Sequence, residues 1–505
     1  MRNFINPAIT QLAFLGYKNI EYWHNNPIEA QIDVLQHLIT SAQYTEFGRK
    51  YDFSNTFSIK TFKEKVPISE YEDFKPYIEQ VLSGEENILW NTPIEWFAKS
   101  SGTTNDKSKF IPLSKECIED CHFKAAKDVL SLYHNFNINT QILAGKGLVI
   151  GGSHQLNPLN EKIQYGDLSA VLLENSPFWS NWIRTPELSI ALLNDWDIKI
   201  DKLAQNTIHE PVSSIAGVPT WSIVLIKKIL ELTQKKQLID VWPQFELFIH
   251  GGVSFEPYKH QCKQLLGENV HFLEIYNASE GFFAAQDNLD EDGMVLFLDH
   301  GIFYEFLPLE DYGKINPKTI GLNKVELNKN YVLIISTNTG LWRYIIGDTI
   351  MFTKLYPFKI KVTGRTKQFI NAFGEELMVF NTDKAIELTC KATHATIKDY
   401  TAAPIYFSDN KNGSHEWLIE FEKHPNSLQN FTEILDKNLQ SLNSDYEAKR
   451  KHNIALSLPI VHAVKSNTFY NWLKQKNKLG GQHKIPRLSN NRYFIDSIKE
   501  GMQKM

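Results

Sequence analysis

The chain has 505 residues, of which 42% are hydrophobic and 22% charged, and its net charge is −5. These fractions exclude a disordered or fibrous protein, and the length predicts about two to four domains instead of one ordinary core. A slightly negative net charge over this length gives no reason to expect nucleic acid as a partner.

The four cysteines are few for this length and favour a reducing compartment. Cys117 and Cys121 lie four residues apart beside His122, but no second pair at metal-ligand spacing accompanies them. We therefore predict buried thiols instead of a zinc site. No apolar run reaches about 18 residues, and the N-terminus lacks the apolar core of a signal peptide. These features predict a cytoplasmic protein without a membrane span.

The N-terminal 90 residues are predicted to be mostly helical, since apolar residues recur at helical spacing in residues 28–43. Short strands are then expected to alternate with helices, and residues 218–236 form a strongly amphipathic helical pattern. The expected strands of this region are 146–152, 245–252 and 270–277. This alternation predicts an α/β architecture with a largely buried sheet.

From about residue 300 to 364, strand-like runs are joined by short polar turns with no room for helices, which predicts a mainly antiparallel region. The pattern changes again after Arg365, where helices and strands suggest a smaller α+β domain. The elements expected there are helices near 381–393, 425–443 and 467–478 and strands at 403–408 and 415–422. We therefore predict two domains, residues 1–365 and 366–505.

The first segment that can carry chemistry is Ser100-Ser101-Gly102-Thr103-Thr104, which follows a strand-like stretch. Gly102 allows a tight turn, neighbouring N–H groups can converge on an anion, and hydroxyls can donate to phosphate oxygens. Lys107 and Lys109 add positive charge. The spacing is not that of a Walker loop, and a polar surface turn is the alternative for this run in isolation.

The second segment, "IYNASEGFF" (275–283), lies at the end of an expected strand, where α/β sheets place ligand-binding groups. Tyr276 can lie flat against an aromatic base, and Glu280 can hold a magnesium ion that bridges phosphates. The alternative for Glu280 is a solvated loop carboxylate.

Three further segments contain candidate residues with ordinary alternatives. Gly347-Asp348 fits a hairpin turn, but an aspartate there can also accept two hydrogen bonds from a ribose diol. Arg365, beside Gly364, can reach a nucleotide or pair with a surface carboxylate. Lys484 lies in "GGQHKIPRLS" (480–489), which is a mobile loop with a solvated lysine under the simplest interpretation.

Taken together, these segments resemble the motifs of the auxin-responsive (Gretchen Hagen) acyl acid amido synthetases, a branch of the adenylate-forming superfamily. In chain order they are "SSGTTNDKSKFIP", "YNASEG", "WRYIIGD", "GRTKQFINAFGEE" and "HKIPRLS". The resemblance implies a large N-terminal adenylation domain of mixed sheets and helices and a smaller mobile α+β C-terminal domain, with ATP bound between them. It also implies a ligase that joins a carboxylic acid to ATP, releases pyrophosphate, and transfers the acyl group from AMP to the amine of an amino acid.

The resemblance further implies roles for individual residues. Those implied to bind the phosphates, or to turn the loop around them, are Ser100, Ser101, Gly102, Thr103 and Thr104. Those implied to lie along the nucleotide are Tyr276, Asn277 and Ser279, with Gly252 and Val253 of "HGGVSFEP" (250–257) along adenine.

On the same resemblance, Glu280 ligates magnesium and Asp348 takes the ribose hydroxyls, with Arg365 nearby. Lys484 is assigned, from its position and charge, to the α-phosphate during adenylation. Glu280 and Lys484 are thus the predicted catalytic residues, and ATP and Mg²⁺ the predicted cofactors.

Two positions depart from the family pattern. Ile345 occupies the place of an arginine that commonly stands two residues before the glycine of the third motif, and strand alternation would put Arg343 on the same face. Lys367 replaces an aspartate common in the hinge motif. There are two alternatives to an amide-forming ligase. The first is an enzyme that transfers the acyl group to a thiol, and the second is a nucleotide-binding protein without enzymatic activity. The sequence identifies neither the acid nor the oligomeric state.

Overall fold

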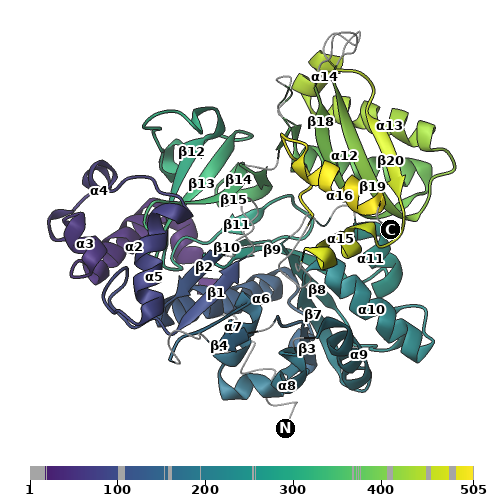
Figure 1. Ribbon diagram of the computed structural model, residues 1–505. Coiled ribbons are helices and arrows are strands. Elements are labelled where there is room, and N and C mark those ends of the chain that lie inside the picture. Colours follow the sequence, from purple (N-terminus) through teal and green to yellow (C-terminus); the bar gives the residue numbers. More distant parts are fainter. Residues whose placement is uncertain are drawn as a thin grey trace. The chain divides into compact units, whose positions relative to one another are not determined.

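The computed structural model describes most of the chain, which forms two compact units. The first contains Met1–Gly252 and Leu265–Val362, and the second contains Val253–Gln264 and Thr363–Met505. Residues outside the described part are 1–16, 19, 101–108, 153, 157–161, 194, 253–254, 256–257, 367–368, 371, 373–374, 376, 407–412, 451–455, 477–484 and 504–505. Figure 1 shows the elements along the chain.

The N-terminal region is helical, as predicted. Its helices are α2 (Pro27–Ala42), α3 (Glu46–Lys50), α4 (Ile59–Lys65) and α5 (Tyr71–Ser83). Helix α2 buries Leu35, Leu38 and Ile39, which the helical spacing places on one face. The Gln31 side chain donates hydrogen bonds to the backbone oxygens of Leu298 and Ile302, so this helix is fastened to a distant part of the first unit.

The main sheet has 11 strands among the described residues, in the order β12-β13-β14-β15-β11-β10-β9-β8-β7-β3-β6. Its parallel part consists of β3 (Lys146–Val149), β6 (Arg184–Thr185), β7 (Val212–Gly217), β8 (Leu247–Gly251) and β9 (His271–Ala278). The predicted helix between β7 and β8 is α10 (Pro219–Thr233). The other helices of this region are α6 (Lys124–Phe136), α7 (Leu168–Glu174), α8 (Leu188–Ala191) and α9 (Trp196–Thr207).

The predicted antiparallel region is also confirmed. Its strands are β12 (Ile302–Pro308), β13 (Asn330–Thr337), β14 (Tyr344–Leu355) and β15 (Phe358–Arg365). Two further antiparallel strands, β10 (Gly281–Ala285) and β11 (Met294–Leu296), precede this region and were not predicted. All seven residues of β12 are buried, which explains why this strand is apolar on nearly every position.

A second, four-stranded sheet of the first unit has the order β2-β1-β5-β4. Its strands are β1 (Trp96–Ser100), β2 (Lys109–Leu113), β5 (Gln164–Gly166) and β4 (His154–Leu156). β1 confirms the expected strand before the hydroxyl-rich segment, whereas β2 was not predicted. A π-helix over Cys117–Phe123 follows, and it buries both Cys117 and Cys121 as expected.

The second unit is an α+β structure with the sheet order β18-β19-β20. Its strands are β18 (Thr396–Ile405), β19 (Ser414–Lys423) and β20 (Ile460–Val464), with a separate pair β16 (Phe369–Ile370) and β17 (Leu377–Met378). Its helices are α12 (Val379–Thr393), α13 (Leu428–Leu442), α14 (Ser444–Arg450), α15 (Thr468–Gln475) and α16 (Tyr493–Gln503). Helix α11 (Lys259–Leu266) belongs to it up to Gln264. The predicted fold class is therefore confirmed.

In the described part of the chain, no helix combines the length and apolar character needed to cross a bilayer.

Candidate active site

The parallel strands of the first unit end at one edge of the sheet, because neighbouring parallel strands run in the same direction. β7 ends at Gly217, β8 at Gly251 and β9 at Ala278. Gly252 directly follows β8 and has a φ of 78°, a left-handed conformation that glycine adopts without strain. This is the edge at which α/β sheets bind ligands.

Ser279 and Glu280 form the two-residue connection between β9 and β10, since Ala278 pairs with Gly281. Both residues are buried, with Glu280 only 6% exposed. A buried carboxylate costs free energy unless it is compensated, so the alternative of a solvated loop carboxylate is wrong. Tyr344 Oη donates a long hydrogen bond of 3.4 Å to Glu280 Oε1.

Lys109 extends this cluster from a third part of the chain. Its Nζ lies 3.5 Å from Tyr344 Oη and 5.3 Å from the centre of the Tyr71 ring. Tyr71 Oη in turn accepts a hydrogen bond of 2.8 Å from the backbone N–H of Phe110. A cation therefore lies beside the tyrosine that contacts Glu280.

Tyr276 and Asp348, which come from the second and third motifs, are in direct contact. Tyr276 Oη donates a hydrogen bond of 2.8 Å to Asp348 Oδ2, and both residues are buried. The Tyr276 ring also packs at 4.8 Å, centre to centre, against Phe283 of β10. The contact fixes the orientation of both side chains.

Asp348 owes its position to an irregularity in β14. Ile345 pairs with Ile334 and Thr349 with Val332, so three residues of β14 oppose the single residue Leu333 of β13. Gly347, at the centre of these three, has a φ of 91°. Such bulges redirect side chains and are frequent beside active sites. The alternative of a hairpin turn at Gly347-Asp348 is therefore wrong, because both residues lie within one continuous strand.

Arg343 is committed to a structural ion pair. Its guanidinium group donates to both oxygens of Glu305, at 2.8 and 2.9 Å, and to the backbone oxygen of Val66 at 2.7 Å. Its φ of 46° places it outside β14, which begins at Tyr344. The strand alternation assumed for Arg343 and Ile345 is therefore wrong, and Arg343 does not replace the arginine missing at Ile345.

Ser100 is the last residue of β1 and pairs with Lys109 of β2. The predicted phosphate segment thus begins at the backbone position opposite the lysine that reaches Tyr344. Several predicted residues lie outside the described part of the chain: Ser101, Gly102, Thr103, Thr104, Val253 and Lys484.

Asn277 is half-buried on β9, next to Tyr276. Arg365 is the last residue of β15, is half-buried and belongs to the second unit. From the predicted set, the structure thus brings Tyr276 and Asp348 into direct contact, and it places Glu280 in the connection that follows the same strand β9.

The donor set around Glu280 suits Mg²⁺ only with further oxygen ligands. Among the described residues, no group of three or more His, Cys, Asp or Glu side chains is placed to hold a metal. Mg²⁺ commonly binds through one or two carboxylates together with substrate phosphates and water. A single buried carboxylate such as Glu280 fits that mode.

Sequence reasoning did not assign Tyr344, Tyr71 or Lys199 to the site. Tyr344 was visible within "WRYIIGD", but only the fold showed that its hydroxyl contacts Glu280. Lys199 Nζ donates to the backbone oxygens of Gly151 at 2.8 Å and Gly152 at 3.0 Å, beyond the end of β3. Burial lowers the pKa of Lys199 to about 8, although nearby Asp167 acts in the opposite direction.

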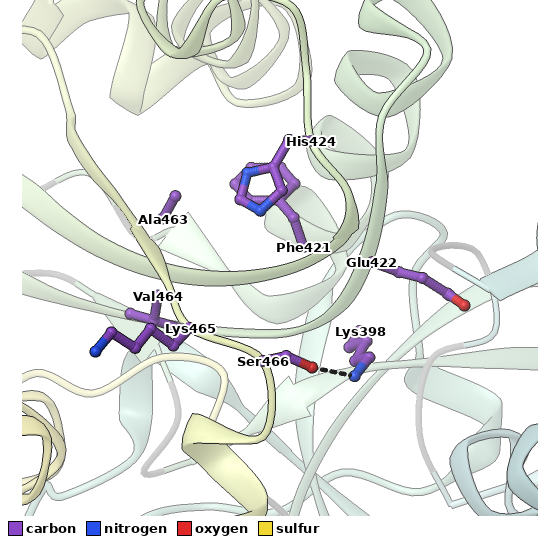
Figure 2. A pocket seen from close by; sticks show the side chains of 8 residues that line it. All are labelled: Lys398, Phe421, Glu422, His424, Ala463, Val464, Lys465 and Ser466. Carbon is purple, nitrogen blue, oxygen red and sulfur yellow. Dashed lines mark hydrogen bonds between the residues drawn. The ribbon is translucent and has the colours of Figure 1, made fainter. Parts of the chain in front are cut away.

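The second unit contains a separate cavity of about 560 Å³. It is lined by Lys398, Phe421, Glu422, His424, Ala463, Val464, Lys465 and Ser466 (Figure 2). Lys398 Nζ donates a hydrogen bond of 2.7 Å to Ser466 Oγ, so this lysine is fixed on one wall. None of these residues was predicted to bind a ligand.

Comparison with known proteins reveals similar chains over most of the length. Jasmonoyl–L-amino acid synthetase of Nicotiana attenuata is 24% identical over 536 residues, covering 90% of each chain. Indole-3-acetic acid-amido synthetase GH3.4 of Arabidopsis thaliana is 22% identical, covering 95% of this chain and 92% of its own. The 4-substituted benzoates-glutamate ligase GH3.12 of Arabidopsis thaliana is 21% identical, covering 93% and 94%.

Solved structures share the fold. The GH3.15 acyl acid amido synthetase superposes with a TM-score of 0.76 at 16% identity, covering 96% of this chain and 95% of its own. A 2-hydroxyisobutyryl-CoA ligase superposes with a TM-score of 0.58 at 12% identity, covering 94% and 92%. The TM-scores show that this chain shares its fold with both proteins.

The family models match in chain order. The N-terminal domain model of the GH3 family matches residues 16–271, the central domain model residues 295–365, and the C-terminal domain model residues 380–493. The resemblance inferred from the motifs is thereby confirmed, and the chain belongs to the GH3 family.

Proposed function

We propose that this protein is an ATP-dependent acyl acid amido synthetase. It activates a small carboxylic acid as an acyl adenylate and transfers the acyl group to the amine of an amino acid, releasing pyrophosphate and AMP. The observation that carries the proposal is the contact between Tyr276 and Asp348, which joins two sequence-distant motifs. Relatives across the family are named as ligases of acids and amino acids, which supports it.

In the adenylation step, a carboxylate oxygen of the acid attacks the α-phosphorus of ATP, and the bond to pyrophosphate breaks. Both reactants are anionic, so the site must neutralise charge and align them. Lys109 supplies positive charge next to Tyr344. The hydroxyls and N–H groups of residues 100–104 bind phosphate oxygens in this proposal.

Tyr276 and Asp348 orient the nucleoside. A carboxylate has about four acceptor sites, and one hydrogen bond from Tyr276 does not exhaust them. Asp348 therefore accepts hydrogen bonds from the ribose hydroxyls while the phenol keeps its carboxylate in place. Glu280 would hold Mg²⁺, which neutralises phosphate charge when bound.

In the second step, the amine nitrogen attacks the acyl carbonyl carbon, the bond to AMP breaks, and the amine gives up a proton as the amide forms. No side-chain nucleophile takes part. Residues 1–365 provide the ATP and acid site in this proposal, and residues 366–505 form the mobile domain that includes Lys484.

The proposal includes a cytoplasmic location. Its support is the cysteine content: Cys117, Cys121, Cys262 and Cys390 are all free thiols. The partners are a small carboxylic acid and an amino acid.

The test is pyrophosphate exchange by the purified protein with ATP, Mg²⁺ and a panel of aryl and alkyl carboxylates. Exchange followed by AMP release with amino acids, and not with coenzyme A, is the expected result. If AMP is released only with coenzyme A, the protein is a thioester ligase and not an amide ligase. Absence of exchange with every acid would favour a nucleotide-binding protein without ligase activity.

A further inference from the structure

The sheet of the second unit is irregular where it borders the cavity shown in Figure 2. The antiparallel pairing of β18 with β19 shifts register twice in succession, and each shift leaves one residue without a partner in the ladder. These two extra residues are Lys398 of β18 and Glu422 of β19, and both line the cavity. Bulges redirect side chains and are frequent beside functional sites. The cavity is therefore bounded by a specific departure from regular strand pairing.

Two hydrogen-bond donors lie side by side on one wall of the cavity. Lys398 Nζ donates a hydrogen bond of 2.7 Å to Ser466 Oγ, which is the dashed line in Figure 2. An ammonium group has three donors, and a hydroxyl that accepts one hydrogen bond still has its own proton to donate. In the described part of the chain, the Ser466 hydroxyl donates to no acceptor. An N–H and an O–H donor at this spacing match the two oxygens of one carboxylate.

Glu420 of β19 holds this wall in place. Its buried carboxylate accepts hydrogen bonds from the backbone N–H groups of Asn467 at 2.8 Å and Phe469 at 3.2 Å, at the start of α15. Ser466 immediately precedes Asn467, so these contacts fix the segment that carries its hydroxyl. Glu420 Oε1 also lies 3.5 Å from Lys398 Nζ. The two donors are thus held in position by the fold itself, which lowers the entropy cost of binding a ligand.

The charges around the cavity balance. Glu422 accepts a hydrogen bond from Gln261 of α11, which belongs to the same unit. Lys465 contributes a second ammonium group, which has no ion pair with any residue that the structure describes. Lys398 and Lys465 thus oppose Glu420 and Glu422, so these four side chains carry no net charge. The paired donors, and not an excess of charge, must therefore select the ligand.

Across the cavity from this pair of donors, Figure 2 shows two rings. The His424 ring is exposed and lies 5.2 Å, centre to centre, from the Phe421 ring at an interplanar angle of 36°. Phe421 is buried and supports the imidazole, while Ala463 and Val464 add aliphatic surface. The volume of about 560 Å³ lies in the range of small-molecule sites, and aromatic rings pack against one another in offset or edge-on arrangements. A planar apolar group therefore fits this wall.

We propose that this cavity binds a small aryl carboxylate. Its carboxylate group accepts hydrogen bonds from Lys398 and Ser466, and its ring packs against His424. All the described residues that line the cavity belong to the second unit, whereas Tyr276 and Asp348 belong to the first. The proposal therefore concerns a second ligand site, and it does not depend on ligase activity.

The test is binding of benzoate to the full chain without ATP or Mg²⁺, measured by ligand-observed NMR titration. Benzamide has the same ring without the charge, cyclohexanecarboxylate has the charge without an aromatic ring, and inorganic phosphate has only the charge. We expect benzoate to bind at least about tenfold more tightly than benzamide, because hydrogen bonds to a charged acceptor are the stronger ones. It should bind about threefold more tightly than cyclohexanecarboxylate through ring packing, and at least about tenfold more tightly than phosphate through apolar burial.

Amide hydrogen exchange locates the bound benzoate. At about ten times its Kd, benzoate should slow exchange up to about tenfold in peptides covering residues 396–400, 420–424 and 463–469. Protection of these peptides assigns the binding to this cavity. Protection confined to peptides of the first unit would overturn the proposal.

Variants of the two donors test their role directly. Lys398→Met removes the ammonium group and should weaken benzoate binding about tenfold, and Ser466→Ala should weaken it about threefold. Ser466→Ala deletes only one exposed oxygen, so it remains informative if Lys398→Met fails to fold. Lys391→Met and Ser441→Ala are matched controls, since both residues are exposed on helices α12 and α13 of the same unit. The controls should bind benzoate like the wild type.

Wild-type affinity in both donor variants would overturn the proposal, as would an equal loss of affinity in the two controls. Equal affinity for benzoate and phosphate, or for benzoate and cyclohexanecarboxylate, would refute recognition of an aryl carboxylate. These measurements need no turnover. Absence of pyrophosphate exchange would therefore count against the proposed function alone, while binding of benzoate decides the second site.

Discussion

Tyr276 Oη donates a hydrogen bond of 2.8 Å to Asp348 Oδ2, joining strands β9 and β14 across 72 positions of sequence. The contact orients an aromatic ring and a carboxylate together, as recognition of a nucleoside requires. It therefore makes the pair the most direct target for mutation.

Replacement of Tyr276 by phenylalanine should raise the KM for ATP by about tenfold and change kcat little. A hydrogen bond to a charged group contributes about 1.5–3 kcal/mol, and its loss removes the phenol that orients the Asp348 carboxylate. Pyrophosphate exchange at varied ATP concentration measures the effect. Tyr331→Phe is the control, because Tyr331 is a fully buried phenol whose hydroxyl accepts from Glu326 N. An equal KM for ATP in Tyr276→Phe and Tyr331→Phe would contradict the role given to Tyr276.

Replacement of Glu280 by glutamine should reduce the rate of pyrophosphate exchange by at least about 100-fold. Loss of a residue that only orients a metal ligand already costs about 10–100-fold in metal affinity or activity, and Glu280 is the proposed ligand itself. The amide keeps the shape of the side chain but removes the charge that binds Mg²⁺. Thermal unfolding of the same variant should be close to that of the wild type, which separates chemistry from folding. Normal exchange by Glu280→Gln would remove Glu280 from the site.

Replacement of Arg343 by methionine should destabilise the first unit by about 3 kcal/mol, because it removes the buried guanidinium that pairs with both oxygens of Glu305 and leaves only Lys63, at 3.2 Å, as a cationic partner among the described residues. The double variant Arg343→Met, Glu305→Leu should recover much of the loss, since it removes both charges. Urea unfolding, monitored by a spectroscopic probe in the first unit, measures the free energy of unfolding of both variants. If the double variant is as unstable as the single one, loss of the Arg343–Glu305 ion pair does not account for the destabilisation.

His300 should make the stability of the protein depend on pH. Burial lowers the pKa of this imidazole, but the hydrogen bond to Asp128 and the nearby carboxylate of Asp299, 3.0 Å from Nδ1, outweigh burial and raise the pKa above its ordinary 6.5. Nearby Lys124 acts in the lowering direction. A raised pKa means that the stabilisation is complete below pH 6.5 and is lost as the pH rises through the folded-state value.

Thermal unfolding midpoints measured upward from pH 6 should therefore fall more steeply in the wild type than in Asp128→Asn. The carboxylate of Asp128 lies 3.0 Å from His300 Nε2, so the amide removes its charge with little change in shape. Parallel pH profiles for the two proteins would refute a charged His300 in the folded state.

Much of the fold followed from local patterns. The strands at 245–252 and 270–277, the helix at 218–236 and the antiparallel region after 300 were predictable, because a periodicity of hydrophobic residues depends only on neighbours in sequence. The order of the motifs likewise indicated the family before any contact was known. Burial of Glu280 was not predictable, because a single acidic residue after a strand fits a solvated turn equally well.

Tertiary structure alone decided which distant residues meet. It put Gly347 and Asp348 into a bulge within β14, paired Arg343 with Glu305, and brought Lys109 to Tyr344. It also joined Tyr258 to Arg487, across 229 positions of sequence. Each of these outcomes depends on strand register and on the choice of a buried partner, which are set by the packing of whole elements and leave no periodic trace in the chain.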